Sequence, residues 1–188
     1  MLKKIFWIYI SVKHFLLKHE RFTILKIDPP KILTHRGITF GKKVRIFWNS
    51  RIECIYKYND EVYQPNIIIE NDVSIQQNCH ITCANKIFIG EKTSIINNVT
   101  ITDILHPYDF GNPRFNKLHV GEITIGHDCF IGSNAVLLGN IKIGNNCTIG
   151  ANTVLKDFTC DDYCIIAGIP GKIIKIYDKE NNIWISKK

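Results

Sequence analysis

Seven cysteines and seven histidines are the side chains of this 188-residue sequence best suited to nucleophilic, proton-transfer or metal chemistry. The cysteines are odd in number, and neither a second cysteine pair nor a histidine accompanies Cys160 and Cys164, which disfavours a disulfide framework and a zinc site. Two histidines, His106 and His119, fall between residues 102 and 122 together with Pro107 and Pro113. This segment is the first place to look for chemistry, because it interrupts an otherwise regular chain.

The regularity is an aliphatic residue at every sixth position, which is neither a helical period nor simple strand alternation. The period predicts a parallel β-helix in which three short strands make one coil of 3 × 6 = 18 residues. The aliphatic residues stack on their equivalents in the neighbouring coils. The repeat opens at Ile125, Ile131, Leu137, Ile143, Ile149 and Leu155, and earlier at Phe40, Ile46, Ile52, Ile69, Ile75, Ile81, Ile89, Ile95 and Ile101.

The fifth place of each hexad is predicted to point inward near a corner, where only a small or β-branched side chain fits. These places hold Val44, Ser50, Val73, Cys79, Asn85, Thr93, Val99, Cys129, Ala135, Ile141, Cys147, Thr153 and Thr159. Cysteines here are expected to act as small buried hydrophobes. Asparagine and glycine in the second to fourth places suit turns that need a positive φ.

Composition agrees with a β-rich chain, since the sequence holds 35 isoleucines against 10 leucines. The net charge of +7 is spread along the chain and not gathered in one block, which disfavours a nucleic-acid partner. Phosphorylated small molecules and an anionic membrane surface are the other classes of partner that a basic protein serves.

Three regions follow from the phase of the repeat. Residues 38–170 form the predicted β-helix domain, with an insertion loop at 102–122, and residues 171–188 a C-terminal strand or tail. Residues 1–37 contain a basic amphipathic stretch that is predicted to be helical. It packs on the coil or, through residues 1–20, rests on a membrane surface. We expect no secretory signal and no spanning helix, because Lys13 interrupts the short apolar run.

Over roughly residues 38–176 the sequence resembles the hexapeptide-repeat acyltransferases, in particular the sugar O-acetyltransferases of the galactoside, maltose and surface-polysaccharide type. Three features carry the resemblance: the repeat run from Ile125 to Val154, the pair His106-Pro107 at the start of an excursion, and the ending Ala167-Gly-Ile-Pro-Gly-Lys172. The resemblance implies a left-handed parallel β-helix and a homotrimer. It places the active sites between neighbouring subunits, with the insertion loop of one subunit closing a site on the next.

The catalytic histidine of that family corresponds to His106, as the general base that takes a proton from a sugar hydroxyl. Its other ring nitrogen needs a partner, for which Asp103, Asp109 and a main-chain carbonyl are open alternatives. These two carboxylates, together with Asn78 and His80, are the candidates for the acceptor side. His119 lines either the pocket or only the loop, and His127 is expected to be solvated.

Acetyl-coenzyme A is the implied acyl donor, with direct transfer, no acyl-enzyme and no metal. The resemblance places the pantetheine arm along Ser133 and Ala151 and along Gly168, Ile169 and Pro170, with the Ser133 amide near the oxyanion. Lys156 and Lys172 are the candidates for the phosphates. The stretch from Gly150 to Asp157 is one residue shorter than the family pattern, which bears on the register of Lys156.

Three alternatives compete with this interpretation. The first is an N-acetyltransferase of a nucleotide-linked amino sugar, which the lack of a separate nucleotide-binding domain disfavours. The second is a non-catalytic trimeric solenoid, and the third is a γ-class carbonic anhydrase, whose histidine spacing the chain does not match. The sequence therefore predicts an O-acetyltransferase that acts on a sugar or glycan of a bacterial surface polysaccharide. The enzyme is expected in the cytoplasm, either free or at the inner face of the membrane.

Overall fold

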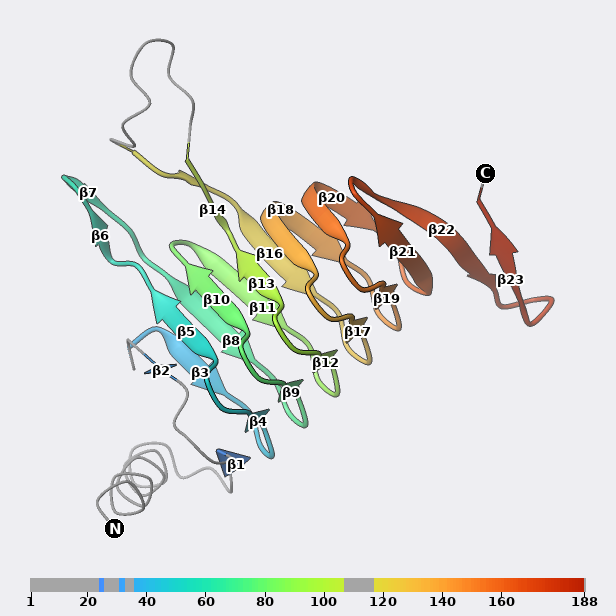
Figure 1. Cartoon of the computed structure of the whole chain (residues 1–188), viewed down its shortest axis with the longest axis horizontal. Coiled ribbons are helices and arrows are strands. Elements are labelled where there is room, and N and C mark those ends of the chain that lie inside the picture. Colours follow the sequence, from blue (N-terminus) through green and yellow to red (C-terminus); the bar gives the residue numbers. More distant parts are fainter. Residues whose placement is uncertain (1–23, 26–30, 33–35, 107–116, 188) are drawn as a thin grey trace.

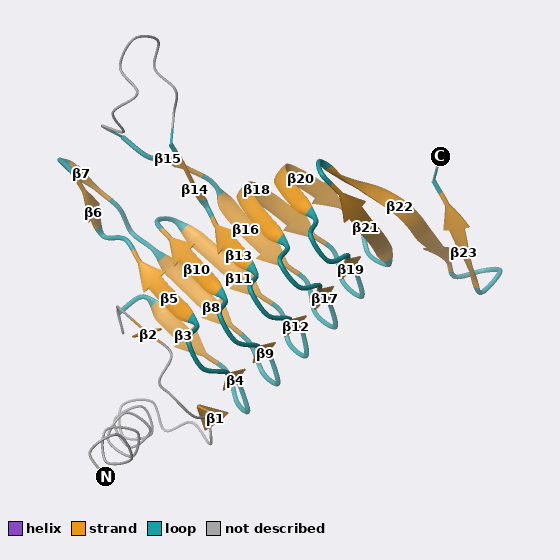
Figure 2. Ribbon diagram, viewed as in Figure 1, coloured by secondary structure: helices purple, strands orange, loops and turns teal. Residues whose placement is uncertain are grey.

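The computed structural model describes residues 24–25, 31–32, 36–106 and 117–187, and every regular element in these ranges is a β-strand (Figure 2). The predicted N-terminal helix and membrane-binding residues 1–20 lie outside the described residues, as does Asp109. No helix among the described residues has the length and apolar character needed to cross a bilayer.

The chain winds as a three-sided parallel β-helix, whose flat sides we call the A, B and C faces (Figure 1). The A face is made of β1 (Ile24–Leu25), β4 (Arg45–Ile46), β9 (Ser74–Ile75), β12 (Ser94–Ile95), β17 (Phe130–Ile131), β19 (Thr148–Ile149) and β21 (Cys164–Gly168). The B face is made of β2 (Lys31–Ile32), β5 (Arg51–Cys54), β10 (His80–Cys83), β13 (Thr100–Thr102) and the first parts of β18 (Val136–Ile143) and β20 (Val154–Cys160).

The C face is made of β3 (Ile38–Phe40), β8 (Asn66–Ile69), β11 (Lys86–Ile89), β16 (Glu122–Ile125) and the last parts of β18 and β20. Both β18 and β20 continue around the corner between the B and C faces, with a register shift between Leu138 and Ile141. After β21 the chain reverses into an antiparallel extension of β22 (Gly171–Asp178) and β23 (Ile183–Ser186).

The aliphatic residue that opens each predicted hexad lies inside the coil, which confirms the main structural prediction from the sequence. All fifteen are buried, and they pair in register with their equivalents one coil away, as Ile52, Ile81 and Ile101 do. Burial of each such side chain contributes about 1.5–3 kcal/mol relative to exposure. All seven cysteines are buried, none of them in a disulfide, and they fill this core as small side chains.

Two of the inward positions predicted from the period of six were wrong, because the coils are not all of one length. Asn85 and Thr159 are exposed. Two extra residues separate the openers of the hexads at Ile81 and Ile89, so Ile87 takes the inward place in that turn. In the last coil Phe158 pairs with Ile141 at a spacing of 17 residues, so Phe158 takes the place where an 18-residue coil would have put Thr159, and Cys160 is buried opposite Ile143.

A ladder of asparagine side chains runs along the edge where the A and B faces meet. Each Asn except the last donates through its side-chain amide to the side-chain oxygen of the Asn one coil further on, over 2.7–3.1 Å. Each also has a left-handed backbone with φ between 57° and 62°, which asparagine adopts more easily than most residues. The members are Asn49, Asn78, Asn98, Asn134 and Asn152.

The opposite edge, where the B and C faces meet, carries the two excursions from the coil (Figure 1). The first contains an antiparallel hairpin of β6 (Lys57–Tyr58) and β7 (Glu61–Val62). The second begins with β14 (Ile104–Leu105) and returns through β15 (His119–Val120). Because β10 alone separates β5 from β13, these excursions leave the coil only about 10 Å apart.

Candidate active site

His106 directly follows β14, at the root of the second excursion. The strand pairing of Leu105 with His119 brings both histidines of the excursion to this root. The His106 side chain is exposed, and its ring lies 5.9 Å from the ring of Tyr58, tilted by 57°. An exposed imidazole held at the foot of a loop is placed to exchange a proton with a bound molecule.

Asp103 holds the root of the excursion from inside the coil. Its carboxylate accepts hydrogen bonds from the backbone N–H groups of Ala84, Asn85 and Lys86 at 2.8–3.0 Å, and from the Cys83 thiol at 3.2 Å. Burial raises the pKa of Asp103 above its ordinary value, and the hydrogen bonds oppose that shift. These contacts favour a structural role for a residue that the sequence offered as a partner of His106 or of the acceptor.

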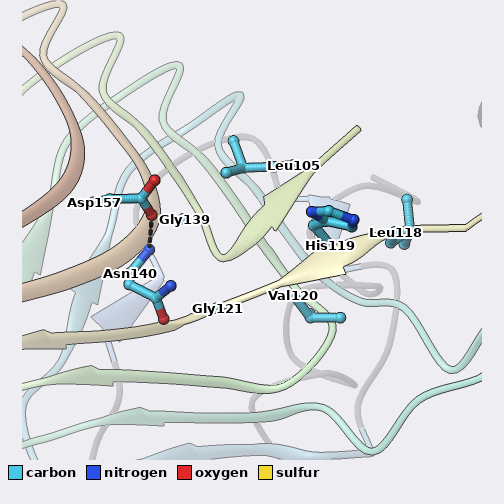
Figure 3. A pocket seen from close by; sticks show the side chains of 8 residues that line it. All are labelled: Leu105, Leu118, His119, Val120, Gly121, Gly139, Asn140 and Asp157. Carbon is cyan, nitrogen blue, oxygen red and sulfur yellow. Dashed lines mark hydrogen bonds between the residues drawn. The ribbon is translucent and has the colours of Figure 1, made fainter. Parts of the chain in front are cut away.

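A pocket of about 450 Å³ lies beside the excursion on the same edge of the coil (Figure 3). His119 and Leu118 lie on one side of it, and Asp157 on the other, where a carboxylate oxygen accepts from the Asn140 backbone N–H at 2.9 Å. The pocket is lined by Leu105, Leu118, His119, Val120, Gly121, Gly139, Asn140 and Asp157.

Gly139 keeps this pocket open at its base. Its φ is +76°, and a Cβ there would lie 2.5 Å from the Asp157 carboxylate and 3.0 Å from Leu105. A larger residue would therefore be strained and would press into the pocket. Sequence reasoning assigned no role to Asn140 or Asp157, because nothing in the repeat distinguishes a turn residue that lines a pocket from one that does not.

The other two acceptor candidates, Asn78 and His80, lie away from His106. Asn78 is a rung of the asparagine ladder on the A–B edge. His80 lies on the outside of the B face, where its Nε2 is 2.7 Å from the Thr82 hydroxyl, next to the ion pair of Arg51 and Glu53. Burial, and then the charge of Arg51, lower the pKa of His80, while Glu53 opposes them.

This lowered pKa gives a stability prediction with a definite sign. The unfolded chain takes up a proton on His80 below about pH 6.5, whereas the folded protein resists it, so unfolding is favoured as the pH falls from 6.5 through the lower folded pKa. We expect the melting temperature of His80→Asn to fall less over this interval than that of the wild type. Parallel curves from thermal melts between pH 5 and 7 would contradict this role of His80.

The residues predicted to hold the acyl donor line the A–B edge near the C-terminal end of the coil. Ser133, Ala151 and Gly168 occupy equivalent places after Ile131, Ile149 and Ile166, which pair in register. The Ser133 hydroxyl donates to the side-chain oxygen of Asn97 at 2.8 Å. The backbone N–H groups of Ser133 and Ala151 donate no hydrogen bond to any described residue, so they are available to an added ligand.

Both lysine candidates are exposed, but Lys156 directly precedes Asp157 and so lies toward the B–C edge, away from these donor-side residues. Lys156 pairs with Leu138 on the B face at the full spacing of 18 residues, so the residue missing from the last coil lies after it and leaves its register intact. Lys172 pairs with Ala167. Ile169 and Pro170, joined by a cis peptide bond, form the turn between Ala167 and Lys172. Ile169 is 72% exposed.

Within one copy of the chain, His106 and the donor-side residues Ser133, Ala151 and Gly168 lie on opposite edges of the B face. The extended chain between Ala135 and Gly139, four residues or roughly 13 Å, separates the two edges. The residues predicted for the donor and for the base therefore do not form one site in a single copy of the chain.

Comparisons with known proteins agree with this architecture. Residues 122–157 match the family model described as bacterial transferase hexapeptide (six repeats). A protein of Escherichia coli (strain K12) that carries the name lipopolysaccharide biosynthesis O-acetyl transferase WbbJ is 32% identical over 127 residues, which are 63% of this chain and 64% of that relative. The match thus spans slightly less than two thirds of the relative.

Solved structures of the same fold are more distant in sequence. AntD, an N-acyltransferase from Bacillus cereus in complex with dTDP and 3-hydroxybutyryl-CoA, superposes with a TM-score of 0.64 at 15% identity, over 90% of both chains. A maltose O-acetyltransferase from Clostridium difficile 630 gives 0.56 at 17% identity, over 88% of this chain and 75% of that one. These likenesses confirm the predicted left-handed β-helix.

Proposed function

We propose that this chain, a hexapeptide-repeat protein built on a left-handed β-helix, is an acetyl-coenzyme A-dependent O-acetyltransferase that acts on a sugar hydroxyl. The observation that carries the proposal is the position of His106, exposed at the root of an excursion that the coil itself does not require. The name of the Escherichia coli relative supports the choice of an O-acetyl transfer.

In the proposed reaction, the His106 imidazole takes the proton of the sugar hydroxyl as its oxygen attacks the thioester carbonyl. The tetrahedral oxyanion accepts a hydrogen bond from the Ser133 backbone N–H, whose availability the structure supports. When the intermediate collapses, the C–S bond breaks and the imidazolium returns its proton to the leaving sulfur. All seven thiols of the chain are buried, which favours direct transfer over an acyl-cysteine intermediate.

The donor is proposed to lie along the column of Ser133, Ala151 and Gly168, with Ile169 and Pro170 at its end. Small residues leave room for an extended pantetheine arm there, and its amide groups can bond to free backbone groups. Lys156 and Lys172 are exposed cations for the phosphates. No step of this reaction needs a metal ion.

The separation of the two predicted half-sites supports a homotrimer in which each active site combines the A–B edge of one subunit with the excursion of its neighbour. Equal amounts of His106→Ala and Ala151→Trp subunits, each inactive alone, are expected to regain about one quarter of wild-type activity when reassembled together. In a mixed trimer one of the three interfaces joins two intact half-sites. No recovery from trimers shown to contain both subunits would contradict the shared site.

The acceptor is proposed to be a sugar of a surface polysaccharide or of its lipid-linked precursor, handled in the cytoplasm or at the inner membrane face. Seven cysteines that form no disulfide fit a reducing compartment. The AntD structure, with its dTDP and acyl-CoA, makes a nucleotide-linked amino sugar the second class to test. An assay of purified protein with acetyl-coenzyme A and a panel of hydroxylated and amino acceptors distinguishes the two acceptor classes. Turnover of the amino sugars alone would overturn O-acetyl transfer.

A further inference from the structure

The two excursions on the B–C edge contact each other, although about fifty residues separate them in the sequence. The Leu118 backbone N–H donates to the Tyr63 hydroxyl at 3.2 Å. Lys117 Nζ lies 3.5 Å from a carboxylate oxygen of Glu61. This ion pair is exposed and adds little stability by itself. Together with the hydrogen bond it holds the β6–β7 hairpin against residues 117–118 of the second excursion, just before β15.

The third contact between the excursions is the one between the rings of Tyr58 and His106, whose centroids are 5.9 Å apart at an angle of 57°. Tilted aromatic pairs at this separation are favourable. Tyr58 is half-buried and lies at the end of β6, paired with Glu61, so the hairpin presents its ring from a short rigid element. His106 lies outside any strand, because β14 ends at Leu105.

We propose that Tyr58 is a positioning residue, which holds the His106 imidazole in the orientation needed to take the acceptor proton. This inference rests on the proposed function of His106. An exposed imidazole samples several rotamers, and each misdirected rotamer removes a share of the enzyme from the reactive geometry. The ring of Tyr58 restricts this rotation, and its hydroxyl is not needed for that purpose.

The test compares Tyr58→Ala with Tyr58→Phe, and uses Val62→Ala as the matched control on the same hairpin, where the side chain is 74% exposed. We expect Tyr58→Ala to lower kcat about tenfold and to leave the KM for acetyl-coenzyme A within about twofold. Tyr58→Phe and Val62→Ala are expected to keep kcat within about twofold of the wild type. Near-normal kcat in Tyr58→Ala, or an equal loss in Tyr58→Phe, would overturn the proposal.

A spectroscopic measurement separates this inference from the proposed function. In protein labelled at histidine, the aromatic ring current of Tyr58 shifts the His106 ring resonances; we expect the shift in the wild type and in Tyr58→Phe, and its loss in Tyr58→Ala. Unchanged resonances in Tyr58→Ala would overturn the contact whatever the activity. Full activity in His106→Ala would instead overturn the proposed function, whereas an inactive His106→Ala beside a normal Tyr58→Ala overturns only the positioning role.

Discussion

Replacement of His106 by alanine is expected to lower kcat at least about 100-fold, the lower end of what general-base catalysis contributes. A sugar hydroxyl is a poor nucleophile at neutral pH, and with no base to take its proton the attack on the thioester carbonyl becomes slow. The side chain is exposed and stands outside the core, so the melting temperature and the oligomeric state are expected to stay unchanged.

His119→Ala is the matched control for this prediction, because His119 is paired with Leu105 on the same root. It lines the neighbouring pocket and is expected to change acceptor KM more than kcat. The account fails if His106→Ala turns over acceptor at a rate close to that of the wild type, or if His119→Ala reproduces the full loss of kcat.

Replacement of Asp103 by alanine is expected to produce the largest loss of stability, about 3 kcal/mol or more. The variant leaves the buried N–H group of Ala84 and the partly buried N–H groups of Asn85 and Lys86 without their acceptor. For a chain of this length the melting temperature would fall by about 6–12 °C. Activity would fall with it, because Asp103 stands three residues before His106 and fixes the root of the excursion.

Asp161→Ala provides the comparison, since this carboxylate is exposed and its removal is expected to change stability by no more than about 0.5 kcal/mol. Thermal melts of the two variants beside the wild type measure the difference. Equal melting temperatures for Asp103→Ala and the wild type would show that the turn at residues 83–86 does not depend on the carboxylate.

Much of the fold could be predicted from the sequence, because the phase of the aliphatic residues is a direct consequence of stacking inside a coil. Ile52, Ile81 and Ile101 lie in one inward column without any local ambiguity. The prediction failed at Asn85 and Thr159, where one turn is lengthened and one coil shortened. The six-residue period describes the average coil. It does not indicate at which corner a particular coil gains or loses a residue.

The candidate site was only partly predictable. The excursion at residues 102–122 can be recognised because it lacks the six-residue repeat. His106 is the residue in it best suited to act as a general base. The burial of Asp103, the contact of Tyr58 with His106 and the place of Asn78 in a ladder depend on which corners of the coil the turns occupy. These relations join residues one or more coils apart, so no local motif announces them.

The bond formed in the product distinguishes O-acetyl transfer with His106 as the base from N-acetyl transfer. Labelled acetyl-coenzyme A, purified protein and a glycan acceptor should yield an acetylated sugar whose label is released by mild alkali and by hydroxylamine, as an ester requires, with its rate of formation at least about 100-fold lower in His106→Ala. Label that resists this treatment would identify an amide and hence N-acetyl transfer. Ester formation in His106→Ala at a rate close to that of the wild type would contradict the proposed base.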